Sequence, residues 1–240
     1  TGNMIDSGAL TIKGTSTLTT SANNTTIILD TTTNAFTGAL TITTNAAMGD
    51  VTIDGGTTRL IIAASTIDGD LTLRSGAAAG ITDSDTVTVG GNLSVTTDAN
   101  NGVINLGSLA VEGTIAVATN DAANNDSAHA TIVNACSTCS GGVGLNFGAS
   151  TVEGNLTATA TTGNMIDSGA LTIKGTSTFV TSANDATITL DQGGHAFKGA
   201  LLITTNDTAS DTAGNVTISA GSGETLNFGS STIDGDLIAT

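Results

Sequence analysis

The chain has 240 residues, of which 38% are hydrophobic, 11% are charged and only five are aromatic, all of them Phe. Asp and Glu number 21 against five Lys and Arg, so the formal net charge is −16. Nucleic acids and anionic membrane surfaces attract basic residues, and this composition argues against both as partners. No apolar run approaches the roughly 20 residues of a membrane-spanning helix, so no membrane span is expected.

Short runs in which an aliphatic residue alternates with Thr or Ser follow one another along the chain. They lie at residues 10–12, 40–42, 51–53, 71–73, 87–89, 93–95 and 216–218. Alternation with period two is typical of a strand with one buried face. Gly, Asn, Asp and Ser separate the runs, as turns require. Because helix formers are scarce, the sequence predicts an all-β protein with strands of about 3–5 residues.

The first third of the chain recurs in its last third. Residues 1–17 read TGNMIDSGALTIKGTST and return unchanged at residues 162–178. The match continues with substitutions and small insertions, so residues 162–240 restate residues 1–79. Such internal repeats favour a repetitive architecture over a sandwich or an ordinary barrel. We expect a single domain over residues 1–240, built from degenerate repeats.

A shorter unit also recurs: Gly, any residue, an aliphatic residue, a small or polar residue, and an aliphatic residue or Ala. It starts at Gly8, Gly38, Gly69, Gly91, Gly113, Gly154, Gly169, Gly199 and Gly235. Two consecutive steps are of 22 residues, whereas other gaps of 15, 30 and 31 residues do not fit one period. Steps of about 20–22 residues with three short strands are the coil of a parallel β-helix, or β-solenoid. The irregular gaps predict some longer rungs, or motifs that lie on different faces.

Within this solenoid, aliphatic and Phe side chains are expected to point inward and stack on their equivalents, while Thr points outward. In the rung that starts at Gly91 we expect strands at residues 93–95, 103–106 and 109–111. The expected core includes Leu10, Ile12, Leu40, Ile42, Leu71, Leu93, Val95, Leu171 and Ile203, with Phe36, Phe147, Phe197 and Phe228. Asn or Asp ends several strands, and stacked Asn amides can bond from rung to rung.

The recurrent strings GALTI, GDLTL, GNLSV and GNLTA, with STIDG or STVEG before them, are similar to those in known bacterial proteins. They resemble the β-helical stalks of filamentous haemagglutinin-type and autotransporter-type adhesins. The resemblance is one of repeat style and covers essentially the whole chain. It implies a secreted, extracellular microbial protein of a surface structure or filament, and it brings no catalytic motif with it.

An enzyme acting on polysaccharides is the main catalytic alternative for a β-helix. Such sites need clustered carboxylates and aromatic platforms for sugar rings. The chain has no Tyr and no Trp, and its basic residues are scattered, so we expect no enzymatic activity and no cofactor. These basic residues are Lys13, Arg59, Arg74, Lys174 and Lys198.

Acidic residues recur at equivalent places in the repeats. They are Asp68, Asp70, Glu112, Glu153, Asp234 and Asp236. A column of carboxylates on one edge of the rod could bind Ca²⁺ weakly, because this ion takes several oxygen ligands. The other interpretation is a solvated acidic edge that keeps the rod soluble.

The only two cysteines, Cys136 and Cys139, lie in a polar stretch over residues 120–142 that departs from the repeat. We predict a local disulfide that pins this loop. Free thiols, a redox pair and half of a zinc site are the alternatives. Zinc would need further ligands from two His, and His195 falls where the first copy has Asn34, a place that suits a turn residue.

These features predict a structural β-solenoid segment of an extracellular microbial filament or adhesin stalk. Joining residue 240 to another residue 1 gives nearly the junction that follows residue 159, so we expect assembly end to end with copies of the chain. The alternative is an adhesive module that binds a glycan, a mineral or ice on its side face. For ice, the outward Thr ladder is interrupted, at Ser94, Ala116, Leu202 and Ile238.

Overall fold

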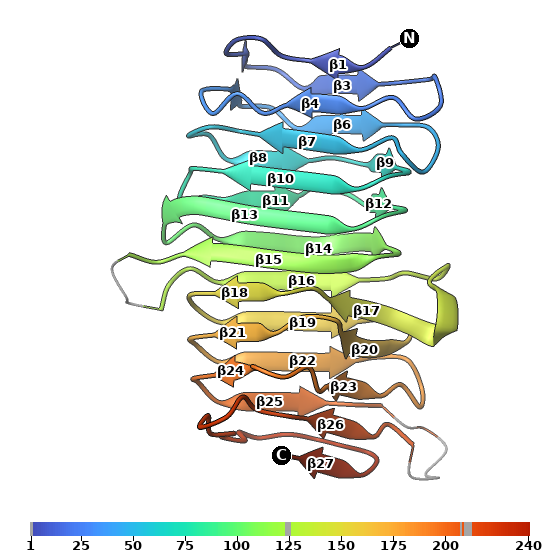
Figure 1. Cartoon of the computed structure of the whole chain (residues 1–240), viewed down its shortest axis with the longest axis vertical. Coiled ribbons are helices and arrows are strands. Elements are labelled where there is room, and N and C mark those ends of the chain that lie inside the picture. Colours follow the sequence, from blue (N-terminus) through green and yellow to red (C-terminus); the bar gives the residue numbers. More distant parts are fainter. Residues whose placement is uncertain (1, 123–125, 207, 209–212) are drawn as a thin grey trace.

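The computed structural model describes residues 2–122, 126–206, 208 and 213–240. The chain winds into a β-solenoid of about 10 turns, with its two termini at opposite ends of a rod (Figure 1). Strands of successive turns pair in parallel, as in β10 with its two neighbours. Outside the strands, the described residues contain one 3-10 turn, η1 (Ser140–Gly142). The predicted fold class, an all-β parallel β-helix, is confirmed.

Two long sheets run along the rod, and their strands lie one above another in Figure 1. Among the described residues the larger sheet has 14 strands: β1 (Met4–Ile5), β4 (Ile27–Leu29), β7 (Val51–Asp54), β10 (Leu71–Ser75), β13 (Leu93–Asn100), β15 (Thr114–Asn120), β17 (Val143–Phe147), β18 (Ser150–Val152), β20 (Asn164–Asp167), β21 (Leu171–Ile173), β23 (Ile188–Leu190), β24 (Ala196–Phe197), β26 (Val216–Ile218) and β27 (Leu237–Ala239). The smaller sheet has 11 there: β3 (Ser16–Thr19), β6 (Leu40–Thr43), β8 (Leu60–Ile62), β9 (Ser65–Ile67), β11 (Ile81–Asp83), β12 (Val87–Val89), β14 (Ile104–Val111), β16 (Ala130–Asn134), β19 (Leu156–Ala160), β22 (Ser177–Thr181) and β25 (Leu201–Thr204). A short pair is formed by β2 (Thr11–Ile12) and β5 (Ala35–Phe36).

The length of a rung can be read from the residues that pair between turns. Leu71 pairs with Leu93, and Leu93 pairs with Ile115, which gives the predicted spacing in the middle of the chain. Some rungs are longer, as the sequence also predicted. The backbone N–H of Val117 bonds the Ser150 side chain, 33 residues away.

One rung shows how the number of strands per turn varies. The strands expected at residues 103–106 and 109–111 form a single strand, β14, whose halves pair separately with β11 and β12. At the corner, the N–H groups of Gly107 and Ser108 donate to the two carboxylate oxygens of Asp83 in the rung before. The corner backbone therefore stays bonded to its neighbour, and the three expected strands become two.

The core is a set of aliphatic columns that run along the rod axis. The expected inward direction is confirmed for these buried residues: Leu40, Ile42, Leu71, Leu93, Val95, Leu171, Ile203, Phe36, Phe147 and Phe197. Leu10 and Ile12 are half-buried and pack against the core. The prediction was wrong for Phe228, whose side chain is 36% exposed. Phe228 lies in the last rung, where it bridges to Leu201 on one side only.

The prediction that Thr points outward was wrong at one place in the repeat. Six threonines that close or directly follow strands are buried: Thr20, Thr44, Thr97, Thr119, Thr181 and Thr205. The hydroxyl of Thr97 donates to the carbonyl of Gly102, and that of Thr181 to the carbonyl of Ala186. A buried hydroxyl is tolerated because it is hydrogen-bonded. These threonines therefore close the turns from inside.

The two copies of the long repeat fold into the same series of strands. Strands β1 to β6 of the first copy correspond to β20 to β25 of the second. Within each copy the Asn that follows the paired Thr bonds the rung before, through Asn45 Nδ2 to Asn23 Oδ1 and through Asn206 Nδ2 to the Ser182 carbonyl. The expected rung-to-rung bonding of Asn side chains is thus present in both copies.

None of the described residues forms a helix long and apolar enough for a membrane span.

Candidate functional site

A ladder of side chains links the rungs along one edge, just before the strands of the larger sheet. Asp50 Oδ1 accepts the backbone N–H of Asp70 at 2.9 Å, and Asp70 Oδ1 accepts that of Asn92 at 2.7 Å. Asn92 Oδ1 then accepts the N–H of Thr114 at 2.9 Å. Each side chain therefore holds the start of the next strand, and Asp70 is a bridge between rungs.

The acidic residues proposed as a calcium column lie on two different sheets. Asp68 follows β9 of the smaller sheet, whereas Glu153 follows β18 of the larger one. Asp68 accepts the N–H of Ala46 at 2.8 Å, and Glu153 forms an ion pair with Lys174. The expectation of one continuous column is therefore wrong, because the motif changes face along the rod. In the part of the chain that the structure describes, no three His, Cys, Asp or Glu gather into a group that could hold a metal ion.

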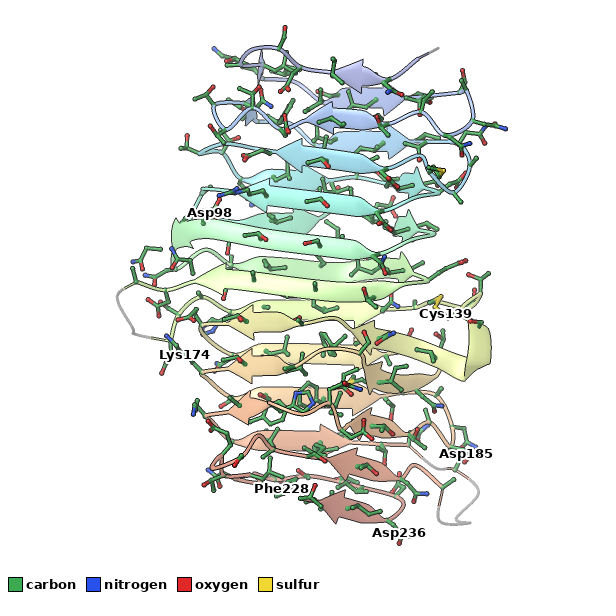
Figure 2. All side chains as sticks on the ribbon, in the orientation of Figure 1. Asp98, Cys139, Lys174, Asp185, Phe228 and Asp236 are labelled. Carbon is green, nitrogen blue, oxygen red and sulfur yellow. A yellow bond between two sulfur atoms is a disulfide. The ribbon has the colours of Figure 1, made fainter. Side chains whose placement is uncertain are left out.

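Glu112 and Asp68 do share one column, but a glycine separates them. Ile67 pairs with Val89 and Val89 with Val111, so the residue between the two carboxylates is Gly90. Glu112 accepts the hydroxyl hydrogen of Thr138. Asp236 lies at the C-terminal end of the rod in Figure 2. Its backbone N–H donates to Asn215 Oδ1 at 2.7 Å.

A second link between rungs comes from the STIDG and STVEG units, and sequence reasoning missed it. The serine hydroxyl accepts a backbone N–H of the rung before in three copies: Ser65 from Ile42 (2.9 Å), Ser150 from Val117 (3.0 Å) and Ser231 from Ile203 (3.0 Å). The acidic residue donates its backbone N–H to a buried threonine of that rung in the same copies: Asp68 to Thr44 (3.1 Å), Glu153 to Thr119 (2.9 Å) and Asp234 to Thr205 (3.0 Å). We call this pair of bonds the rung clamp. The recurrence of Ser with Asp or Glu three residues on is the signal that could have identified it.

Ion pairs also connect the rungs on the outside of the rod. Among the described residues, three pairs between Lys or Arg and its nearest carboxylate join Arg74 to Asp98, Lys174 to Glu153 and Lys198 to Glu224. Figure 2 shows Asp98 and Lys174 on one edge of the rod. Lys13, the equivalent of Lys174 in the first copy, has no carboxylate oxygen within ion-pair distance among the described residues.

The buried pair of His195 and Asp167 ties two rungs together inside the second copy. His195 Nδ1 accepts the backbone N–H of Leu171 at 2.9 Å, so the ring hydrogen lies on Nε2. That Nε2 is 2.8 Å from Asp167 Oδ2, and both side chains are completely buried. His195 is thus a buried bridge, where the sequence suggested a turn residue.

The equivalent pair in the first copy is Asn34 with Asp6. Asn34 Oδ1 accepts the N–H of Leu10 at 2.8 Å, and its Nδ2 donates to Asp6 Oδ2 at 2.7 Å. Burial raises the pKa of Asp6, but the hydrogen bonds from Asn34 and Thr31 outweigh this and hold that pKa below its usual value. The amide and the imidazole therefore accept equivalent backbone N–H groups, but only the amide also hydrogen-bonds its aspartate.

Cys136 and Cys139 are joined by a disulfide of 2.04 Å, next to η1. Figure 2 places Cys139 on the edge of the rod away from Lys174. The loop is held to its neighbours because the Thr162 hydroxyl donates to the Cys136 carbonyl at 2.6 Å. Of the polar stretch over residues 120–142, residues 123–125 lie outside the described part of the chain.

The outward threonines form short columns on both sheets. Thr131, Thr157 and Thr178 are in register, and the column then continues with Leu202. On the larger sheet, Thr52 and Thr72 are followed by Ser94. Neither column is an uninterrupted array of Thr.

One family model matches the chain in two segments. It is described as repeats of unknown function (DUF5649). The matches cover residues 1–43 and 133–204, which contain β1 to β6 and β17 to β25. The matches include both sets of strands that recur in the same order, β1 to β6 and β20 to β25. No curated protein and no solved structure matches the chain.

Proposed function

We propose that the chain is a structural β-solenoid segment of an extracellular microbial filament or adhesin stalk, and that it joins end to end with copies of itself. The observation that supports this most is the continuity of the links between rungs. Each turn is bonded to the next by the backbone ladder, and many turns also by the side-chain ladder, the rung clamp or an outside ion pair.

This arrangement suits a mechanical role. The rod axis lies along the direction of the hydrogen bonds between strands, about 4.8 Å per rung. A pulling force therefore acts on many parallel bonds of each rung at once. The side-chain bridges add further bonds in the same direction. The proposed role is non-enzymatic.

The net charge also fits a rod that is exposed to solvent. With a formal charge of −16, neighbouring rods repel each other sideways. Lateral aggregation is thereby disfavoured, while contact at the ends buries apolar side chains. The proposed product is a thin, long filament.

Electron microscopy of the purified 240-residue chain tests the proposal. We expect rods of one width whose length grows with protein concentration, together with sedimentation coefficients that rise over the same range. Immunogold labelling of the source cells should place the protein on the outside. Single short rods at every concentration, or label confined to the cell interior, would contradict the proposal.

A further inference from the structure

The last rung of the chain is a near copy of an internal rung. Residues 226–240 match residues 145–159 at 10 of 15 positions, and the five differences are small: Ala to Ser, Val to Ile, Glu to Asp, Asn to Asp and Thr to Ile. The first rung is likewise represented inside the chain. Residues 3–17 are identical to residues 164–178.

These two internal rungs are direct neighbours. Strand β17 pairs with β20, β18 with β21 and β19 with β22. The register places Leu145 against Met165 and Thr151 against Thr172. The chain therefore contains, in its interior, a folded example of its own last rung stacked on its own first rung.

We propose that a second copy of this chain docks on the C-terminal rung in the register of this internal pair. This inference rests on the proposed end-to-end assembly and specifies its interface. Residues 226–240 of one copy pair with residues 4–19 of the next. Leu226 then lies against Met4, Thr232 against Thr11 and Leu237 against Ser16 of the second copy.

The apolar side chains of the two end rungs fit this arrangement. Phe228 and Leu237 are 36% and 45% exposed, whereas their internal equivalents Phe147 and Leu156 are fully buried. On the other end, Leu10, Ile12 and Leu18 are only half-buried, and their equivalents are Leu171, Ile173 and Phe179, all fully buried. Figure 2 shows Phe228 in the last rungs of the rod. Docking would bury both sets and remove apolar surface from water.

The polar contacts of the internal pair can also form at the junction. Lys174 pairs with Glu153 across the two internal rungs, and the corresponding residues at the junction are Lys13 and Asp234. Asn155 Oδ1 accepts the N–H of Thr176 at 2.8 Å. Asp236 has the place of Asn155 and carries the same acceptor oxygen, so it can continue the side-chain ladder into the second copy.

The second copy is turned about the rod axis relative to the first. Strand β17 belongs to the larger sheet, but Phe228 bridges to β25 of the smaller sheet. Strand β1 of the second copy therefore extends the smaller sheet of the first. The chain already contains such a change of face, because the STIDG unit of β9 lies on the smaller sheet and the STVEG unit of β18 on the larger.

Cysteine cross-linking tests the register. Thr11 and Thr232 are both exposed, and in the proposed register their Cα atoms are about 4.8 Å apart, within the range of a disulfide. The variant T11C with T232C should give a ladder of covalent oligomers on mild oxidation, which reductant collapses to monomer. The control A9C with T232C moves one cysteine two residues along the same face, to about 8 Å, and should cross-link at least about tenfold more slowly.

A charge exchange tests the same interface without cysteines. K13E should weaken association by about fivefold or more, because it replaces an exposed ion pair by repulsion. D234K in the same chain should restore association. Both variants leave the internal Lys174–Glu153 pair unchanged. Circular dichroism of each variant is the control for folding.

The results separate the register from the assembly itself. Rods that grow from the unmodified chain, with equal cross-linking in both cysteine pairs or no rescue by D234K, overturn the register and leave end-to-end assembly standing. Dimers from T232C alone show contact between two C-terminal ends and also overturn it. An unmodified chain that stays monomeric, together with a T11C/T232C variant that never cross-links, overturns both proposals.

Discussion

Asn34 and His195 make the same bridge between rungs in the two copies of the repeat. Each is buried, each accepts a backbone N–H, from Leu10 and Leu171 respectively, and each faces an aspartate. An amide and an imidazole both present an acceptor for this N–H, but only Asn34 also hydrogen-bonds its aspartate, whereas His195 Nε2 lies 2.8 Å from Asp167 Oδ2 without forming a hydrogen bond. The feature common to both copies is the acceptor atom for the backbone N–H.

This relationship predicts how His195 responds to substitution. H195N should retain the bond to Leu171, while H195L fills the space but leaves that buried N–H unpaired. We expect H195L to lower the free energy of unfolding by about 1–3 kcal/mol more than H195N does, measured by urea denaturation. H195N itself should lose some packing against Phe197, whose ring centroid is 5.4 Å from that of His195. Equal losses in the two variants would show that the bond is unimportant.

Leu93 lies in a column between Leu71 and Ile115 and is 1% exposed. L93A should therefore cost about 2–5 kcal/mol of stability, because it leaves a cavity between the side chains of the rungs above and below. The neighbouring Ser94 points outward, and S94A should change stability by no more than about 0.5 kcal/mol. Guanidinium denaturation of both variants checks the prediction, which fails if the two changes are alike.

The rung clamp gives a prediction for Ser150. S150A leaves the backbone N–H of Val117 without its acceptor in a buried position, and we expect a loss of about 1–3 kcal/mol. Hydrogen exchange of the Val117 amide should accelerate in this variant. The adjacent Thr151 is exposed, so T151A is the matched control and should stay within about 0.5 kcal/mol of the native chain. Unchanged protection of Val117 in S150A would rule out the clamp.

The raised pKa of Asp54 predicts that the stability of the chain depends on pH. Burial raises the pKa of Asp54, although the N–H of Gly56 and the Arg74 guanidinium act in the opposite direction. A carboxyl whose pKa is higher in the folded state binds its proton more tightly there. Its contribution to the free energy of unfolding therefore falls as pH rises from the unfolded pKa through the folded one.

D54N retains the acceptor for Gly56 and cannot ionise. Relative to the native chain, D54N should therefore gain stability between about pH 3 and about pH 7. Urea denaturation at the two pH values measures this difference. D98N removes the exposed partner of Arg74 and should not show the same gain. The prediction would be contradicted if the native chain became more stable relative to D54N as pH rises.

The disulfide between Cys136 and Cys139 closes a very short loop. Its effect on the unfolded chain is therefore limited, and C136S with C139S should cost about 2 kcal/mol or less. Reductant should destabilise the native chain by the same amount and leave the variant unchanged. A larger loss would mean that the bond holds more of the rod than its own loop. Limited proteolysis should then find new cleavage well beyond η1.

The sequence by itself determined the architecture. In a parallel solenoid, equivalent residues of successive rungs lie directly above one another, so a repeat in the sequence is also a list of contacts. The 22-residue steps from Gly69 to Gly113 therefore predicted the pairing of Leu71, Leu93 and Ile115 without further information. The alternation of aliphatic residues with Thr likewise identified most of the core, because it reports which side of a strand is buried.

The tertiary structure decided which face each motif occupies and which polar side chains turn inward. The place of a motif around the axis depends on the summed length of the rungs before it, and the long rung between Val117 and Ser150 moves the STVEG unit onto the other sheet. Thr97 and His195 are buried because backbone groups at the turns supply hydrogen-bond partners inside the rod. Those partners exist only once the chain has turned, so residue polarity and local pattern could not reveal them.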